Sequence, residues 1–185
     1  MAADRARSVR DSVERERRRR VFFALWPDED TREALVRASR FAVERSAGRA
    51  TPRANLHVTL VFLGAVSAAE LARLRQIPPP PAPRFVLPID TLGFRSRARL
   101  LWAAPGTVPP ALLELESWLW SELAELGISR ERRAYLPHVT LARRARHVGE
   151  TLTPVRWPVA EFVLVESSPG ARSSVYEILE SWPLK

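Results

Sequence analysis

Short apolar runs separated by polar, glycine or proline positions dominate the pattern of this chain. Runs of this length, rich in aromatic and β-branched residues, are typical of strands rather than helices. They predict strands over 21–25, 56–63, 85–92, 100–104, 135–142, 161–167 and 174–182. Apolar residues at helical spacing predict helices over 28–46, over 68–75 after a cap at Ser67, and from Pro109-Pro110 to Gly127.

A proline-rich segment divides this pattern near its middle. Residues 78–83 hold five prolines and must be extended, because proline fixes φ and has no N–H to donate. We interpret the segment as a spacer between two lobes; a ligand for a proline-reading domain is the alternative. The length of 185 residues suits one domain, or two small lobes folded together.

Composition excludes several classes of protein. The chain has no cysteine, so disulfide scaffolds, thiolate metal sites and cysteine nucleophiles are ruled out. It has no run of about 18 apolar residues, so no transmembrane helix is predicted. The N-terminus lacks the apolar region of a secretory signal, and a cytoplasmic location is therefore expected.

The charge is basic and unevenly distributed. The formal net charge is +8, and residues 1–20 hold eight arginines but only four acids, so half of the excess lies there. A basic balance suits a polyanionic partner such as RNA. The run 17–20 is also typical of a solvated, poorly ordered terminus.

The sequence His-Val-Thr-Leu occurs twice, at 57–60 and at 138–141. The context repeats as well, because each copy follows a strand and an amphipathic helix. An internal repeat of this kind suggests two α+β lobes related by a pseudo-twofold axis. Residues i and i+2 of a strand share a face, so each histidine and its threonine point the same way.

Two facing lobes would therefore bring two imidazoles and two hydroxyls into one cleft. This set suits a phosphate, because Thr59 and Thr140 can donate hydrogen bonds to its oxygens. One of His57 and His138 can take a proton while the other gives one, since imidazole titrates near neutral pH. The residues alone leave open which histidine does which.

Two other readings of these residues are weaker. A zinc site would need a third ligand, and no histidine or acid lies at ligand spacing beside either motif. The third histidine, His147, lies in an arginine-rich segment and is expected to be a surface residue. A serine hydrolase is not indicated, because no serine lies in a nucleophile-elbow pattern.

With its two His-x-Thr motifs the chain resembles the 2H phosphoesterase superfamily. Within it the chain is similar to bacterial and archaeal RNA 2′,3′-cyclic phosphodiesterases, once called 2′-5′ RNA ligases. The resemblance is carried by segments 20–25, 55–64, 135–143, 164–167, 176–179 and 182–184. One departure is Tyr135, where the family commonly has Phe. The resemblance covers residues 20–185, which would form one bilobal domain. Residues 1–19 would then be a basic, flexible extension.

The resemblance implies a bilobal α+β fold, with antiparallel sheets, helices packed outside them and an active site in the central cleft. It implies opening of RNA 2′,3′-cyclic phosphate ends to 2′-phosphomonoesters without metal or other cofactor. His57 would be the proton donor and His138 the proton acceptor. Thr59, Thr140 and Arg143 would bind the phosphate. Tyr135 is a candidate for stacking on a base.

These observations lead to one main hypothesis and two alternatives. The main hypothesis is a monomeric cyclic phosphodiesterase without membrane attachment, acting on RNA ends such as tRNA fragments or on small cyclic nucleotides. The reverse reaction, 2′-5′ joining of RNA, would use the same residues. The remaining alternative is a non-catalytic RNA-binding module that uses the basic arm.

Overall fold

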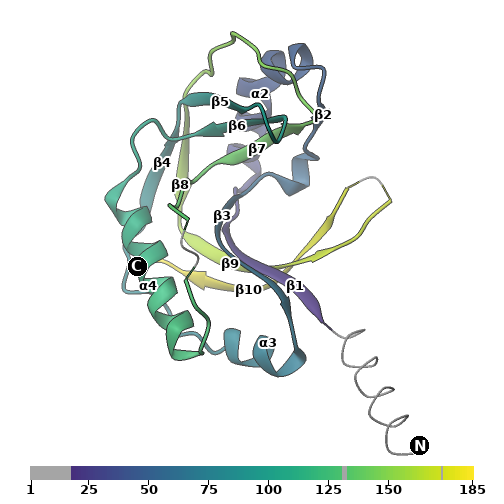
Figure 1. Cartoon of the computed structure of the whole chain (residues 1–185). Coiled ribbons are helices and arrows are strands. Elements are labelled where there is room, and N and C mark those ends of the chain that lie inside the picture. Colours follow the sequence, from purple (N-terminus) through teal and green to yellow (C-terminus); the bar gives the residue numbers. More distant parts are fainter. Residues whose placement is uncertain (1–17, 131–132, 172) are drawn as a thin grey trace, which may run out of the picture.

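One large antiparallel sheet forms the frame of the molecule (Figure 1). The computed structural model describes residues 18–130, 133–171 and 173–185, so the expected extension over 1–19 lies almost wholly outside it. The strand order is β10-β9-β1-β3-β7-β6-β5, with β2 paired to β7. These strands are β1 (Arg19–Leu25), β2 (Arg49–Ala50), β3 (Val58–Val66), β5 (Thr91–Arg95), β6 (Leu100–Ala104), β7 (Val139–Arg143), β9 (Glu161–Ser168) and β10 (Val175–Pro183).

The sheet has two halves that meet at a narrow joint. Strands β10, β9, β1 and β3 form one half, and β7, β6 and β5 form the other. Between β3 and β7 a single pair, Val58 and Val139, is in register, and both side chains are fully buried. The predicted bilobal α+β architecture is thereby confirmed. A separate ribbon pairs β4 (Phe85–Ile89) with β8 (Val155–Val159).

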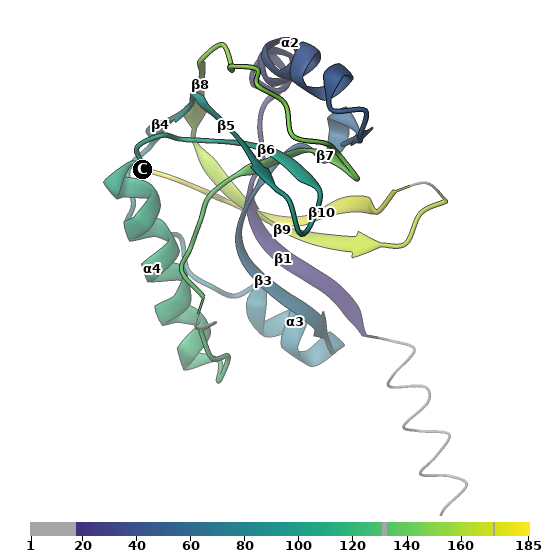
Figure 2. The ribbon, with the colours of Figure 1, turned by 45° about the horizontal axis from the view of Figure 1, so that its top comes forward.

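The two long helices are exchanged between the halves. Helix α2 (Glu29–Arg45) lies between β1 and β3 in sequence, yet it packs against β7 and β8. Helix α4 (Pro110–Glu125) lies between β6 and β7 in sequence, yet it packs against β3. Figures 1 and 2 show α2 beside β6 and β7, with α4 and the short α3 (Ala68–Leu74) toward β1 and β3. Each repeat therefore covers the strands of the other.

Local signals account for the helix ends. The Asp28 side chain accepts a hydrogen bond from the Thr31 N–H at 2.8 Å, which caps α2. Ser67 and Glu70 form a capping box at the start of α3, as the sequence predicted for Ser67. Gly127 follows the end of α4 with a φ of 80°, a conformation that glycine adopts without strain.

Aromatic packing fills the centre of the half that contains β9. Phe162 is fully buried, stacks on Trp182 with ring centroids 5.0 Å apart, and meets Trp118 of α4 at 6.1 Å. The Trp182 indole N–H donates to the Ile77 carbonyl at 2.7 Å. Because Ile77 directly precedes the proline segment, this bond ties the end of the chain to that segment.

The proline segment connects α3 to β4 and pairs with the C-terminus. The Lys185 N–H donates to the Ala82 carbonyl at 3.0 Å, and the Arg84 N–H donates to the Lys185 carbonyl at 2.9 Å. The segment belongs to neither a helix nor a strand, and it bends at Pro81. That residues 20–185 behave as one domain stays a prediction.

Several predicted strand limits were wrong. The expected strand over 85–92 is two strands, because the chain passes from one sheet to the other at Asp90, whose carboxylate accepts the Gly106 N–H at 2.7 Å. The strand expected to stop before Gly64 continues to Val66. The strand expected over 135–142 covers only Val139–Arg143, and β8 was not predicted. Among the described residues no helix is long and apolar enough to cross a membrane.

Candidate active site

Both motif histidines stand immediately before a strand and are held in the same way. The His57 Nδ1 lies 2.7 Å from the Asn55 carbonyl, and the His138 Nδ1 lies 2.8 Å from the Leu136 carbonyl. A carbonyl oxygen can only accept, so the hydrogen of each neutral ring is on Nδ1. The Nε2 atom of each histidine is therefore the one left for chemistry.

The predicted phosphate-binding residues line one cleft together with the two histidines. This cleft has a volume of about 660 Å³, and its walls include His57, His138, Thr59, Thr140 and Arg143. The His57 Nε2 lies 3.1 Å from the Thr59 Oγ1. The repeat therefore does what the sequence indicated: it brings both motifs to one place.

A β-bulge follows each threonine and decides which later residues face the cleft. Between β1 and β3 the register skips Leu60, and between β6 and β7 it skips Leu141. Both copies then show the same burial pattern: two successive buried residues follow the half-buried threonine, and an exposed residue comes next. Bulges of this kind re-aim side chains beside active sites.

The bulges turn Phe62 and Arg143 onto the cleft face. Each lies five residues after its histidine, where strict alternation would have buried it. Both line the cleft, and the Phe62 side chain is 46% exposed. Equivalent positions of the two repeats thus present an aromatic ring on one side and a guanidinium on the other.

The cleft carries positive charge. Arg20, Arg49, Arg143 and Arg144 line it, and no carboxylate does so in the described part of the chain. The Arg20 guanidinium also lies over the Phe62 ring, 5.7 Å from its centroid. Such a surface attracts a polyanion.

Tyr135 lies away from this cleft. It lines a smaller hollow of about 160 Å³, which borders the cleft at Thr59, Phe62 and His138. Burial raises the pKa of its hydroxyl, which has no hydrogen-bond partner in the described residues. The ring is partly buried and packs against the core, and its stacking on a base stays a prediction.

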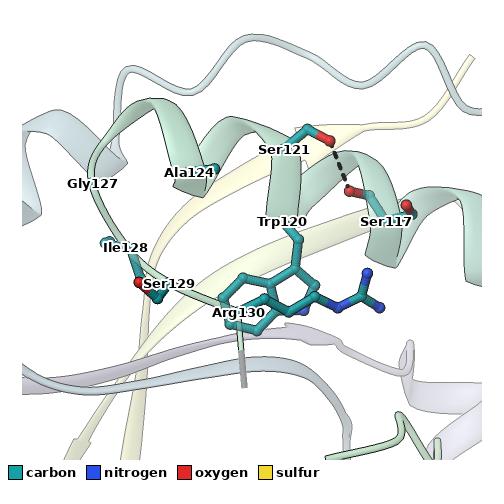
Figure 3. Close-up of a pocket in the computed structure, with 8 residues that line it drawn as sticks. All are labelled: Ser117, Trp120, Ser121, Ala124, Gly127, Ile128, Ser129 and Arg130. Carbon is teal, nitrogen blue, oxygen red and sulfur yellow. Dashed lines mark hydrogen bonds between the residues drawn. The ribbon is translucent and has the colours of Figure 1, made fainter. Parts of the chain in front are cut away.

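A further hollow, at the C-terminal end of α4, contains none of the predicted site residues (Figure 3). Arg130, one of its walls, donates two hydrogen bonds to the buried Glu116 carboxylate, at 2.8 and 3.0 Å. The Trp120 indole N–H donates to the same carboxylate at 2.9 Å. This ion pair fastens the loop after α4 to the helix, which is a structural task.

Comparison with known proteins gives close relatives over nearly the whole chain. RNA 2′,3′-cyclic phosphodiesterase of Escherichia coli K12 is 34% identical over 177 residues, covering 89% of this chain and 96% of the relative. The chain belongs to the RNA 2′,3′-cyclic phosphodiesterase family, within the 2H phosphoesterases. A search with protein-family models gave no match.

Solved structures of the family share the fold. The crystal structure of E. coli LigT in apo form superposes with a TM-score of 0.80 at 31% identity, covering 91% of this chain and 99% of that one. The structure of E. coli LigT complexed with 3′-AMP has a TM-score of 0.77 at 30% identity with the same coverage. These family members therefore match both halves of the sheet.

The environments of the two histidines differ from each other. Burial, together with the charges of His138 and Arg143, lowers the pKa of His57 from 6.5 to about 4, although the hydrogen bond to the Asn55 carbonyl opposes this shift. Burial also lowers the pKa of His138, together with Arg95, Arg133 and Arg143. Both rings are therefore neutral at pH 7 in the free protein.

The sequence analysis did not identify several residues that line the candidate cleft. The sequence could have pointed to Phe62, because aligning the two repeats places Phe62 and Arg143 at equivalent positions. Arg20, Arg49 and Arg144 had none, since the chain is rich in arginine throughout. Among the described residues, no three His, Asp or Glu side chains stand close enough together to hold a metal ion.

Proposed function

We propose that this protein opens 2′,3′-cyclic phosphate ends of RNA to 2′-phosphomonoesters by a metal-independent mechanism with two histidines. The observation that carries the proposal is the cleft itself. Two histidines, each bonded to a backbone carbonyl through Nδ1, and two threonines come from equivalent strands into one positively charged space. The names of the curated relatives agree with the reaction.

The proposed mechanism uses each histidine once. The neutral His138 Nε2 takes a proton from water as the water oxygen bonds to phosphorus. The bond between phosphorus and O3′ breaks, and the protonated His57 gives its proton to O3′. The phosphate stays on O2′, so atoms and charge balance without another reactant.

The remaining cleft residues would stabilise the transferring phosphoryl group. The hydroxyls of Thr59 and Thr140 lie beside the histidines and can donate to the non-bridging oxygens. Arg143 would offset the charge that grows on these oxygens in the transition state.

The terminal nucleotide would lie across Phe62. A half-exposed ring in a cationic cleft is a platform on which any base can stack. Arg20, Arg49 and Arg144 would hold the phosphates of the preceding nucleotides. The site thus suits RNA ends in general, tRNA fragments and small cyclic nucleotides included, rather than one sequence.

The experiment that tests this proposal is an assay of the full chain in EDTA with an RNA that ends in a 2′,3′-cyclic phosphate. We expect ring opening to a 2′-phosphate at the same rate before and after metal removal, because the histidines supply both proton transfers. RNA bound without any ring opening would instead indicate a binding module. Loss of activity in EDTA, restored by a divalent metal, would contradict the mechanism.

One observation favours 2′-5′ joining of RNA as a second activity. The hollow beside His138 is lined by Arg95 and Arg133 and opens at the histidine that would activate the nucleophile. A 5′-hydroxyl there would take the place of water, with its own phosphates on these arginines. Adding 5′-hydroxyl RNA to the assay should then yield a 2′-5′ linked product, and hydrolysis alone would exclude this activity.

We further predict an acidic optimum for kcat/KM. The reaction needs one protonated and one neutral imidazole, and the pKa values of both lie below 6.5, that of His57 near 4. Above pH 6.5 both rings are neutral, and as the pH falls both become charged, His57 with a pKa of about 4, so kcat/KM falls on either side. The optimum of kcat should lie at a higher pH than that of kcat/KM, because the bound phosphate favours the imidazolium and so raises its pKa. A kcat/KM that rises steadily above pH 7 would contradict the scheme.

A further inference from the structure

Three aromatic rings enclose His57. The Trp26 ring, just after β1, stacks on the imidazole with 14° between the planes and 5.5 Å between centroids. Phe22 lies 5.0 Å away at 36°, and Tyr176 of β10 meets the imidazole edge-on at 5.4 Å. Trp26 and Tyr176 also contact each other at 6.1 Å, so the rings form a continuous wall.

His138 has a different environment, although its motif is identical. One aromatic ring, that of Trp102, lies near it in the described structure, at 6.3 Å and steeply inclined. Trp102 is held there because it lies directly over Gly93, where any Cβ would overlap the indole. The charges nearest His138 belong to arginines, which favour its neutral form. The two histidines are thus differentiated by their surroundings.

Within residues 18–130, 133–171 and 173–185, His57 has no acidic partner of the kind that usually stabilises a protonated catalytic histidine. No carboxylate lines the cleft among the described residues. The charged or titratable groups that face His57 are Arg143 and His138 of the β7 segment and Tyr176 of β10, and the first two disfavour its protonation. Apart from substrate, the groups that can favour the cation are the Asn55 carbonyl, the Thr59 hydroxyl and the aromatic faces.

We propose that Trp26, with Phe22 and Tyr176, forms an aromatic cage that stabilises the protonated form of His57 and thereby makes this histidine the proton donor. A cation against an indole face is attracted by the negative potential of the ring, most strongly where water is excluded. Trp26 is a positioning residue, since it acts through His57. Its effect on His57 is independent of the proposed function, whereas its catalytic consequence rests on that function.

Two roles of Trp26 predict opposite results, which makes the proposal testable. If the indole face stabilises the cation, replacing it with an aliphatic side chain lowers the pKa of His57. If the indole merely keeps water out, the smaller side chain admits water and raises that pKa toward its ordinary value. Trp26→Leu keeps the site apolar, and Trp26→Phe keeps an aromatic face.

The experiment is an NMR titration of the three histidine Cε1–H signals of the full chain, free and with saturating inorganic sulfate, which remains a dianion throughout. We expect Trp26→Leu to lower the pKa of His57 by about 0.5 to 1 unit and Trp26→Phe by less. His138 and His147 serve as internal references. A His57 pKa that is unchanged or raised in Trp26→Leu overturns the cage.

Kinetics separate this inference from the proposed function. On an RNA cyclic phosphate, Trp26→Leu should lower kcat about 3- to 10-fold with little change in KM, and Trp26→Phe should restore most of it. If the wild-type protein opens no cyclic phosphate, the proposed function fails while the titration still decides the cage. If the wild-type protein is active but Trp26→Leu does not lower the pKa of His57, the proposed function stands and only the aromatic cage is refuted.

Discussion

Replacing either His57 or His138 with alanine should lower kcat/KM for an RNA 2′,3′-cyclic phosphate by about 10²- to 10⁴-fold. In the proposed mechanism each imidazole performs a different proton transfer, one from water and one to O3′, so neither can replace the other. The double variant should lose little more than either single one, since both act in the same step. KM should change far less, because Thr59, Thr140 and Arg143 remain to bind phosphate.

The chain provides a matched control in its third histidine. His147 is exposed, packs edge-on against Phe94 at 5.8 Å, and does not line the cleft. His147→Ala should therefore retain wild-type rates in the same EDTA-containing assay. Equal losses in all three variants would indicate a general defect in folding, and full activity in His57→Ala or His138→Ala would refute the two-histidine mechanism.

Phe62→Ala should raise KM for RNA ends about 5- to 150-fold, because base stacking on an aromatic ring contributes about 1–3 kcal/mol. Since the ring does not touch the reacting atoms in the proposed mechanism, kcat should change little. Phe62→Leu should recover only part of the loss, because leucine covers the base without a π face. The measurement is a steady-state comparison on cyclic-phosphate RNA.

Phe41 offers the corresponding control. It is 62% exposed on α2 and carries Arg40 over its ring at 4.9 Å, so it repeats the pairing of Arg20 with Phe62 outside the cleft. Phe41→Ala removes a similar ring and a similar cation contact. Its KM should stay at the wild-type value. A KM for Phe62→Ala that is likewise unchanged would show that the base is held elsewhere.

Much of the site could be predicted because its chemistry repeats locally. Identical His-Val-Thr-Leu segments in similar contexts identified His57, Thr59, His138 and Thr140 without any knowledge of contacts. Period-two alternation correctly placed each histidine and its threonine on one side. Alternation alone failed at Phe62, because a β-bulge changes the face of a strand without leaving a composition signal.

The strand limit before the second motif was wrong because of long-range packing. Tyr135, whose stacking on a base stays a prediction, packs its ring against the core at a neighbouring hollow. The chain from Tyr135 to His138 precedes β7 instead of belonging to it. Two residues near each other in sequence can therefore differ in whether they line the cleft, since His138 does and Tyr135 does not.

The sequence by itself determined the repeat, the lobed α+β architecture and the four residues of the two motifs, because these depend on local pattern and on residue chemistry. The tertiary structure decided what makes two identical motifs unequal. Helices α2 and α4 cross to the opposite halves, Trp26 and Tyr176 converge on His57, and arginines gather near His138. Proton affinity depends on burial, charges and aromatic faces within a few ångströms, and residues distant in sequence supply them here.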